Sequence, residues 1–427
     1  MREALAGLTV RGRAFAAAGV TAVVCSVLLG QTALSRVGIL LVTLPLLTAF
    51  FVGRSRYKLA LVRTVHPQIV PAGQPARVRL TLTNEGRTPS GALLLEDHVP
   101  YVLGSRPRFV LEGISKGWRR HITYQVRSDI RGQFQIGPMT VRVNDPFGLV
   151  GLGRAFRTTV PLTVTPRTVP LPTIPLGGGW TGSGDNRPRA FATGSAEDVT
   201  VREYRHGDDL RRVHWRSSAR IGELMVRREE QPWQSRATVF LDNRTISHRG
   251  HGIASSLEAA VSAAASVAVH LSHRGFMVRL VTASGEDTTG AWHFRDADLN
   301  TGPLLEALAV VVPLEHARLD SGWLSEPMGG GLTVAVLGAV QDTDVPALRR
   351  MQHHTSSAIA IALDVGAWAN PNGGDGGAAP LLAQHGWRSA TLRPRDRLDA
   401  VWQELGRAST QSSRTADSGL ASQAVFE

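Results

Sequence analysis

The segment Ala237–Leu271, ATVFLDNRTISHRGHGIASSLEAAVSAAASVAVHL, decides the fold of the C-terminal half of the chain. It begins with a short apolar strand, Ala237–Asp242, that ends in an acid. Further on, Ser255 and Glu258 have the spacing of a capping box. The apolar residues that follow the strand recur at helical spacing, namely Ile253, Leu257, Val261, Ala264, Val267, Ala268 and Leu271. The segment therefore predicts a strand followed by an amphipathic helix.

The alternation of strands and helices continues toward the C-terminus. Further elements are predicted as strands over Phe276–Thr282, Leu332–Leu337 and Ala358–Leu363, and as helices over Leu304–Val312, Val345–Met351 and Asp399–Leu405. Strands that alternate with helices indicate a parallel sheet covered on both faces. We expect an α/β domain over residues 237–406 and a disordered tail, rich in Ser, Thr and Gln, over residues 407–427.

The region from Tyr57 to Pro170 has a different hydrophobic period, which is two. In Ala76–Asn84, ARVRLTLTN, the alanine, valine and leucines share one face of a strand, and the arginines and threonines share the other. Turn signals separate such runs, among them NDPFG at Asn144–Gly148, where Phe147 can anchor the turn inward. This pattern predicts an antiparallel β-sandwich over residues 57–170.

Two uncharged apolar runs lie near the N-terminus. Ala14–Ser35 and Val37–Gly53 each have about the length that a helix needs to cross roughly 30 Å of hydrocarbon, and we expect a tight turn that contains Arg36 between them. A secretory signal peptide is the alternative, but its apolar core is shorter and the second run argues against it. Basic residues flank the hairpin on its outer sides, so the positive-inside rule predicts a multi-pass protein of the cell membrane whose soluble domains are cytoplasmic. The transmembrane hairpin is expected over residues 1–56.

The composition restricts the classes of partner. The 427 residues carry a net charge of +12, yet only Lys58 and Lys116 of the 47 basic residues are lysines, and such an arginine bias often reflects genome composition. Residues 54–236 hold 29 basic and 15 acidic residues, which favours an anionic membrane surface as the counterpart. The single cysteine, Cys25, excludes an intrachain disulfide. We expect a lipid membrane as a partner and no nucleic acid.

Two segments separate the sandwich from the α/β domain: a linker rich in Pro and Gly over residues 171–189, and a charged segment over residues 190–236. The centre of the charged segment is Val201–Arg220, VREYRHGDDLRRVHWRSSAR. Its mixture of opposite charges and aromatic residues indicates a polar network held by Tyr204 and Trp215. We expect Trp215 to anchor a core rather than to stack on bases, because the chain lacks interleaved basic and aromatic residues.

Eleven residues of this segment have the spacing of a known family motif. They are Arg202, Glu203, Tyr204, Gly207, Asp208, Asp209, Arg211, His214, Trp215, Ala219 and Arg220. Together with the N-terminal hairpin, an Arg131–Gly132 element in the sandwich and the turn Asp145–Leu149, they resemble the bacterial domain-of-unknown-function fifty-eight family. The resemblance covers most of the chain.

This resemblance implies a membrane protein with a von Willebrand factor A-like α/β domain. It also implies an adaptor or chaperone-like role beside a MoxR-type AAA+ ATPase, in a set that can include a transglutaminase-like membrane protein. No catalytic residue is established for the family, so none is carried over. The motif residues are therefore candidates for binding a partner.

The expected metal site of such a domain is degenerate in this chain. A von Willebrand factor A-type site resembles Asp-x-Ser-x-Ser after the first strand, and its oxygen ligands bind a hard cation such as Mg²⁺. Here Asp242 is present, but Arg244 and Ile246 stand at the positions of the hydroxyl groups. Because an arginine beside the carboxylate neutralises it and repels a cation, we expect no metal and a pairing of Asp242 with an arginine or a helix end.

The paired acids Asp208 and Asp209 have two interpretations. In the first they are a catalytic acid/base pair that acts with His214 on an unknown substrate. In the second, which we favour, the surrounding arginines keep both acids ionised in bidentate pairs. His206 and His214 lack zinc-site spacing, and Gly177–Gly179 lacks the Lys-Ser/Thr of a P-loop, so no cofactor is expected.

The sequence thus predicts a membrane-anchored, non-enzymatic scaffold. It would present the charged segment 201–230 to a partner such as a MoxR-type ATPase, in cell-envelope assembly or chaperone-like maturation. An enzyme that uses Asp208, Asp209 and His214 is the alternative, and binding of anionic lipid or nucleic acid by residues 54–236 is a third, weaker hypothesis.

Overall fold

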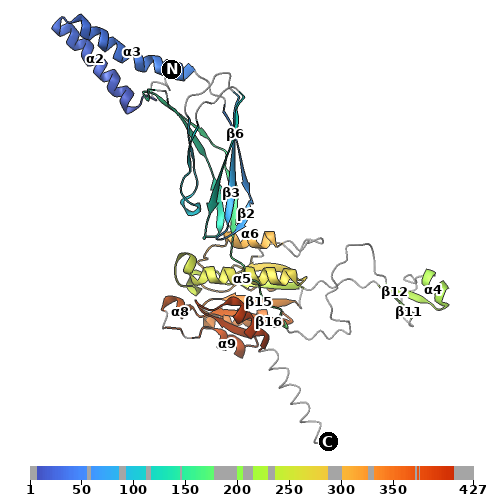
Figure 1. Cartoon of the computed structure of the whole chain (residues 1–427). Helices are drawn as coiled ribbons and strands as arrows, with labels where there is room; N and C mark the ends of the chain where they lie inside the picture. Colours follow the sequence, from blue (N-terminus) through green and yellow to red (C-terminus); the bar gives the residue numbers. More distant parts are fainter. Residues whose placement is uncertain are drawn as a thin grey trace, which may run out of the picture. The chain divides into compact units, whose positions relative to one another are not determined.

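The computed structural model of the chain has two compact units, which are described separately (Figure 1). The first unit consists of Met1–Thr168, Gly250–Ala265 and Gly302–Val312, and the remaining residues form the second. The structure describes residues 7–54, 59–85, 93–111, 117–144, 147–176, 200–204, 215–228, 236–286, 301–325, 331–370, 373–374 and 376–407. Two apolar N-terminal helices and antiparallel sheets lie in the first unit, and a five-stranded parallel sheet lies in the second, as the sequence predicts.

The N-terminal helices form a hairpin. Helix α2 spans Val10–Leu29 and α3 spans Thr32–Arg54, and both are long and apolar enough to cross a membrane. The turn is shorter than the sequence suggests, because Gly30 ends α2 in a left-handed conformation with φ 65° and α3 begins two residues later. The prediction that Arg36 lies in the turn is therefore wrong, since this residue lies inside α3.

Glycines allow the two helices to approach closely. A Cβ atom on Gly19 would lie 2.8 Å from the carbonyl oxygen of Gly38, and one on Gly38 would lie 2.9 Å from the carbonyl oxygen of Gly19. Any larger side chain at either position would push the backbones apart. The hairpin is therefore a packed pair of helices.

The β-sandwich consists of short strands from three sheets. The described strands are β1 (Leu59–His66), β2 (Ile69–Pro71), β3 (Pro75–Asn84), β4 (Leu93–Asp97), β5 (Arg108–Leu111), β6 (Arg119–Arg127), β7 (Gly132–Ile136), β8 (Met139–Asn144), β9 (Gly151–Phe156) and β10 (Val160–Thr165). The strand orders are β1-β3-β6, β2-β10-β7 and β5-β4-β8-β9. The strand pairs are antiparallel except β2 with β10.

The core of the sandwich follows the predicted period of two. On β3 the side chains of Ala76, Val78, Leu80 and Leu82 are fully buried, whereas the arginines between them are exposed. Burial of one face per strand supplies the main stabilising term of such a sandwich.

A buried polar group lies within this apolar core. Arg63 on β1 donates from Nη2 to Asp97 Oδ1 at 2.5 Å and from Nη1 to the carbonyl oxygen of Thr158 at 2.6 Å, and the Tyr124 hydroxyl donates to Asp97 Oδ2 at 2.6 Å. The side chains of Arg63 and Asp97 are 1% and 0% exposed. Burial raises the pKa of Tyr124 far above its usual value, and the hydrogen bond to Asp97 raises it further. The phenol therefore stays protonated and donates to the carboxylate.

Arg131, at the start of β7, holds two helical segments of the same unit. Its Nε donates to Glu258 Oε2 at 2.9 Å, and Glu258 lies in the first turn of α5 (Ser256–His273). Its Nη1 donates to carbonyl oxygens at the end of α6 (Gly302–Val310), namely those of Leu308, Ala309 and Val311. The predicted capping box is only half formed, because Ser255 Oγ accepts from the backbone of Glu258 while the Glu258 carboxylate bonds to Arg131. The arginine thus satisfies carbonyl groups that the end of α6 leaves open.

The second unit is built on a parallel sheet with the strand order β14-β13-β15-β16-β17. Its strands are β13 (Arg236–Leu241), β14 (Met277–Thr282), β15 (Leu332–Leu337), β16 (Ser357–Leu363) and β17 (Arg388–Leu392). In the chain they alternate with α5, α6, α7 (Val345–His353), α8 (Val365–Ala369) and α9 (Ala379–Gln384), and residues 398–407 form a last helix. The sequence did not predict β17, α8 or α9. Strand β17 is a sheet edge that mixes Arg, Ser and Thr with its apolar residues, so it lacks a continuous apolar run.

Residues 172–176 belong to the second unit and bond to its strands and its last helix. The carbonyl oxygen of Pro172 accepts from Trp402 Nε1 at 3.1 Å, and that of Leu176 accepts from the hydroxyl of Ser357 at 2.7 Å. Arg388 donates to the carbonyl oxygen of Pro175 at 2.7 Å and also to Leu176. The first residues of the expected linker are therefore held against the parallel-sheet unit, and residues 177–189 lie outside the described part.

Candidate functional site

The carboxyl edge of the parallel sheet has the position at which α/β proteins bind ligands. Strand β13 is the first of the sheet in the chain and lies between β14 and β15, so the connections diverge at the β13–β15 boundary. Open α/β sheets place ligands in the crevice outside such a boundary. Asp242 directly follows β13, and Asp344, in the short helix η7 (Asp342–Asp344), follows β15.

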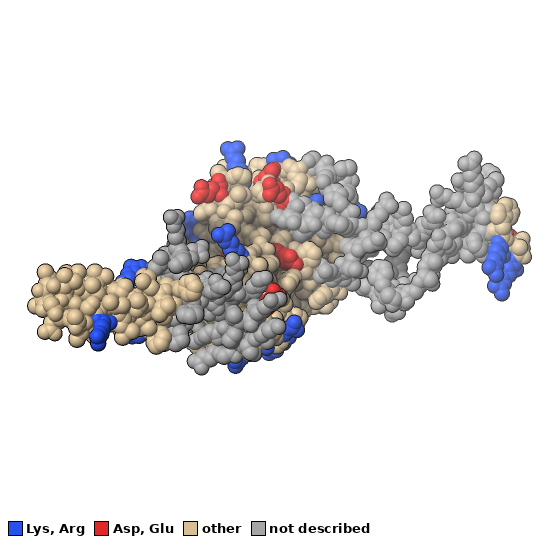
Figure 2. All heavy atoms as spheres, turned by 90° about the horizontal axis from the view of Figure 1, so that it is seen from above, with Lys and Arg blue, Asp and Glu red and all other residues tan. Residues whose placement is uncertain are grey.

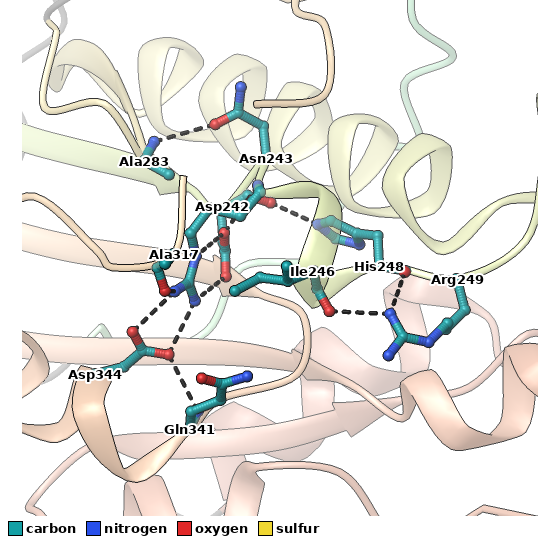
Figure 3. Close-up of polar contacts among 10 residues, drawn as sticks. Asp242, Asn243, Ile246, His248, Arg249, Ala283, Ala317, Gln341 and Asp344 are labelled. Atoms are coloured by element: carbon teal, nitrogen blue, oxygen red, sulfur yellow. Dashed lines mark hydrogen bonds and ion pairs between the residues drawn. The ribbon is translucent and has the colours of Figure 1, made fainter. Parts of the chain in front are cut away.

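A buried arginine joins these two carboxylates (Figure 3). Arg244 donates from Nε to Asp242 Oδ1 and from Nη2 to Asp242 Oδ2, both at 2.9 Å. On the other side it donates from Nη1 to Asp344 Oδ1 at 2.8 Å and from Nη2 to Asp344 Oδ2 at 3.0 Å. All three side chains are 0% exposed. The guanidinium thus forms two bidentate pairs, which is the geometry that arginine and carboxylate groups favour.

The electrostatics of this cluster keep the Arg244 guanidinium charged. Burial alone would lower the pKa of Arg244, but the hydrogen bonds and charges of Asp242 and Asp344 outweigh burial and raise it. The prediction that Asp242 pairs with an arginine is confirmed. The guanidinium lies between the two carboxylates and bonds to both of them. In the described part of the chain, no group of three or more His, Cys, Asp or Glu residues is arranged to hold a metal ion.

The chain itself covers this edge of the sheet. The carbonyl oxygen of Ser247 accepts from the backbone of Ala339 at 2.9 Å, and Asn243 Oδ1 accepts from the backbone of Ala283 at 3.2 Å. A Cβ atom on Gly338 would overlap the carbonyl oxygen of Ser247, so this position requires glycine. The segment after β13 therefore packs directly on the edge where other α/β proteins hold a ligand.

His248 lies beside the cluster and is buried. Its Nε2 is 2.6 Å from the carbonyl oxygen of Asp242, and because a carbonyl only accepts, Nε2 carries the proton. Burial lowers the pKa of His248, and the nearby charges of Arg244 and Arg249 lower it further, against the opposing effect of Asp242.

This lowered pKa predicts how stability depends on pH. The unfolded chain takes up a proton at His248 near the ordinary pKa of about 6.5, before the folded chain does, so this residue destabilises the fold as the pH falls below that value. The loss amounts to at most about 1.4 kcal/mol for each unit by which the pKa is lowered. A His248→Gln variant is expected to lose less stability between pH 7 and pH 5, measured by hydrogen exchange of peptides from β13. His353→Gln, at an exposed site, is the control and should keep the profile of the parent. An unchanged profile in the first variant would contradict the argument.

The described residues of the family-motif segment form two strands and the helix α4. Strand β11 (Thr200–Glu203) pairs with β12 (Met225–Arg228), with Arg202 opposite Val226 and Glu203 opposite Met225, and α4 (Trp215–Ile221) precedes β12. The backbone of Tyr204 continues the pairing by donating to the carbonyl oxygen of Leu224 at 2.8 Å. The predicted motif residues Gly207, Asp208, Asp209, Arg211 and His214, together with His206, lie outside the described residues.

Helix α4 presents apolar and basic side chains to solvent. Trp215 is 71% exposed, Ile221 58% and Leu224 43%. Arg216, Ala219 and Arg220 are also exposed, and Figure 2 shows basic side chains on the described residues of this element. The inward contact is made by Ser218, whose Oγ accepts from the backbone of Met225 at 2.9 Å. The prediction that Trp215 anchors a core is therefore wrong. The mixture of charged and aromatic residues suggested burial of the tryptophan, but the seven-residue helix directs Ser218, and not Trp215, toward β12.

Sequence reasoning missed Asp344 as a partner of Arg244. The two residues are 100 positions apart, so no local spacing connects them. A usable signal exists, however. The predicted strand Ala237–Asp242 ends in an acid, Asp344 lies in the segment after the predicted strand Leu332–Leu337, and the carboxyl ends of parallel strands share one edge of a sheet.

The chain thus combines two apolar helices of membrane-spanning length, antiparallel sheets and a parallel sheet with helices, and the two helices suggest an association with a membrane. The family model described as "Protein of unknown function DUF58" matches residues 200–299 and supports the resemblance noted for the motif. No curated protein sequence matches the chain.

Several solved structures are similar to part of the chain. The CARDB domain of a Pyrococcus furiosus protein, in complex with di-metal ions, has 12% identity and a TM-score of 0.20, and the match covers 26% of this chain and 94% of that one. A chain from the human complex of zinc 2-glycoprotein with prolactin inducible protein has 12% identity and a TM-score of 0.21, and the match covers 26% of this chain and 98% of that one. The putative ApaA protein of Bordetella pertussis has 17% identity and a TM-score of 0.19, over 25% and 94%. TM-scores of this size support no inference about function.

Proposed function

We propose that this protein is a membrane-anchored, non-enzymatic adaptor that binds a protein partner through the exposed face of α4. The partner we propose is a MoxR-type AAA+ ATPase, acting in cell-envelope assembly or chaperone-like maturation, with a transglutaminase-like membrane protein in the same set. The match of residues 200–299 to the family model supports the family resemblance, and this choice of partner is what that resemblance implies.

The observation that carries the proposal is the exposure of Trp215 beside Arg216 and Arg220. Tryptophan and arginine are the residues most enriched among those that dominate binding energy at protein interfaces. The two arginines are one helical turn apart, so they lie on the same side of α4 and can bind carboxylates together. The complementary surface is an apolar pocket with acidic residues at its rim.

The buried cluster at the sheet edge supports a role without catalysis. Arg244 neutralises Asp242 and Asp344 at the position where α/β domains hold ligands, and this leaves neither carboxylate available for proton transfer there. We also propose that the parallel-sheet unit is von Willebrand factor A-like. An acid directly after the first strand and the parallel sheet with helices between its strands support that assignment.

The membrane part of the proposal follows from α2 and α3. Both helices have the length and hydropathy of membrane spans, and Arg11 and Arg13 lie in the first turn of α2. Arginines at this end favour a cytoplasmic location by the positive-inside rule. The sandwich and the parallel-sheet unit would then be cytoplasmic, with both helices crossing the cell membrane.

The proposal predicts a large loss of binding when the α4 face is altered. Purified full-length protein in nanodiscs is titrated with the ATPase that co-purifies from native membranes, and the dissociation constant is measured for the parent, Trp215→Ala and Arg216→Glu/Arg220→Glu. We expect each variant to bind at least about 30-fold more weakly, which corresponds to the 2 kcal/mol or more of an interface hot spot.

Matched variants separate this effect from general changes. Tyr101→Ala removes an aromatic side chain that is 91% exposed, and Arg349→Glu reverses an exposed charge on α7. Both should bind as the parent does. Unaltered binding by the folded Trp215→Ala and Arg216→Glu/Arg220→Glu variants would refute the α4 surface, and the absence of any ATPase from native membrane extracts would refute the partner.

A further inference from the structure

The turn between β8 and β9 is bonded to the start of helix α2. The backbone of Thr9 donates to the carbonyl oxygen of Leu149 at 2.9 Å, and its Oγ1 donates to the carbonyl oxygen of Gly148 at 2.7 Å. The backbone of Gly151 donates to the carbonyl oxygen of Gly7 at 2.9 Å. Hydrogen bonds therefore run from residues 148–151, between the turn and the start of β9, to the residues that lead into α2.

Close packing strengthens this connection. Leu149 and Val150 are 2% and 0% exposed and form an apolar cluster with Ala49 of α3, to which Leu8 and Leu44 add partly buried side chains. Gly12 of α2 leaves no room for a larger residue, since a Cβ atom there would overlap the carbonyl oxygen of Leu149. Residues of both helices therefore contact the turn, and these contacts fix the position of the turn along the axis of the hairpin.

Two exposed side chains lie at this position along the hairpin. Phe147 is 61% exposed, which corrects the prediction that it anchors the turn inward. Arg11 is also exposed, and its Nη1 lies 3.8 Å from where a Cβ atom on Gly148 would be. An aromatic ring and a guanidinium group are therefore presented together beside the first residues of α2.

We propose that Phe147 and Arg11 form a lipid-binding element that contacts the anionic headgroups of the membrane surface. This inference rests on the membrane part of the proposed function, in which α2 begins at the bilayer surface. Aromatic rings lie at the level of the headgroups, and arginines near the ends of membrane helices extend toward the phosphates. Anionic headgroups are the favoured partner because the guanidinium adds an attraction that neutral lipids lack.

The test measures the depth of spin labels in nanodiscs that contain the full-length protein. Cys25 is the only cysteine of the chain, so a Cys25→Ala background accepts single labels. One label replaces Phe147, a second replaces Val27 on α2 (79% exposed), and a third replaces Tyr101 (91% exposed). Tyr101 comes a few residues after β4. The last residue of β4, Asp97, pairs with Met139, which is the end of β8 that lies away from the turn. The readout is the collision rate of each label with oxygen, which enters lipid, and with a nickel chelate, which stays in water.

The expected result is a label at position 147 that is more accessible to oxygen and less accessible to nickel than the label at position 101. This shift should be larger in phosphatidylglycerol than in phosphatidylcholine, and Arg11→Gln should abolish the difference between the two lipids. An aqueous label at position 147 beside a lipid-buried label at position 27 overturns the lipid-binding element alone. Equal depth in both lipids overturns the preference for anionic headgroups. Aqueous labels at both positions overturn the membrane anchor as well.

Discussion

Replacing Arg244 with alanine is expected to lower the free energy of unfolding of the parallel-sheet unit by about 3–5 kcal/mol, because it leaves two buried carboxylates without their counter-charge. Both carboxylates are 0% exposed, so water cannot replace the guanidinium without opening the edge of the sheet. Hydrogen exchange of peptides from β13 and β15 in the full-length protein measures the effect locally, which a multi-domain chain requires.

A double-mutant comparison makes this prediction specific. Arg244→Ala combined with Asp344→Asn should be less destabilised than the sum of the two single variants, because the second change removes one of the orphaned charges. Arg349→Ala, which alters an exposed arginine on α7 of the same unit, is the control and should change stability by no more than about 0.5 kcal/mol. Additive losses in the double variant, or a stable Arg244→Ala protein, would be incompatible with the role assigned to the arginine.

Replacing Asp97 with alanine should destabilise the β-sandwich by a similar amount, about 3–5 kcal/mol. The change leaves the guanidinium of Arg63 buried without a carboxylate, and it removes the acceptor of the Tyr124 hydroxyl. Tyr124→Phe removes a single hydrogen bond from the same group and should cost less, about 1–1.5 kcal/mol. The measurement is hydrogen exchange of peptides from β1 and β6.

The matched control for Asp97 is an exposed acid of the same unit. Asp129 lies 3.5 Å from Arg127 and 3.8 Å from Arg167, and its side chain is 52% exposed. Surface pairs of this kind contribute little, so Asp129→Ala should change stability by less than about 1 kcal/mol. If Asp97→Ala and Asp129→Ala had equal effects, the importance assigned to burial of the Arg63–Asp97 pair would be refuted.

The elements that the sequence predicted correctly have strong periodic patterns. On β3, buried residues alternate with exposed arginines, and on α5 the residues Val261, Ala264 and Ala268 recur at helical spacing and are fully buried. The strand Leu332–Leu337 agrees with β15 at both ends because every one of its residues is apolar and buried. The edge strand β17 is short and mixes polar with apolar residues, so its composition was too weak a signal to predict a strand.

The candidate site was harder to predict because it depends on contacts between distant residues. Local spacing placed Arg244 beside Asp242, and the structure confirms their pairing. The second carboxylate, Asp344, becomes a neighbour only through the order of the strands in the sheet. The exposure of Trp215 and Phe147 was likewise not foreseen, since a large apolar residue within a motif or a turn favours burial on average.

The wide sequence separation within the Arg244 cluster has a consequence for synthesis on the ribosome. At about 5–20 residues per second, Asp344 emerges roughly 5–20 s after Arg244, whereas Asp242 emerges almost together with it. During this interval Asp242 is available to the guanidinium of Arg244, whereas its second carboxylate has not yet been made. The complete cluster can therefore form only after translation has passed the third strand of the sheet, β15.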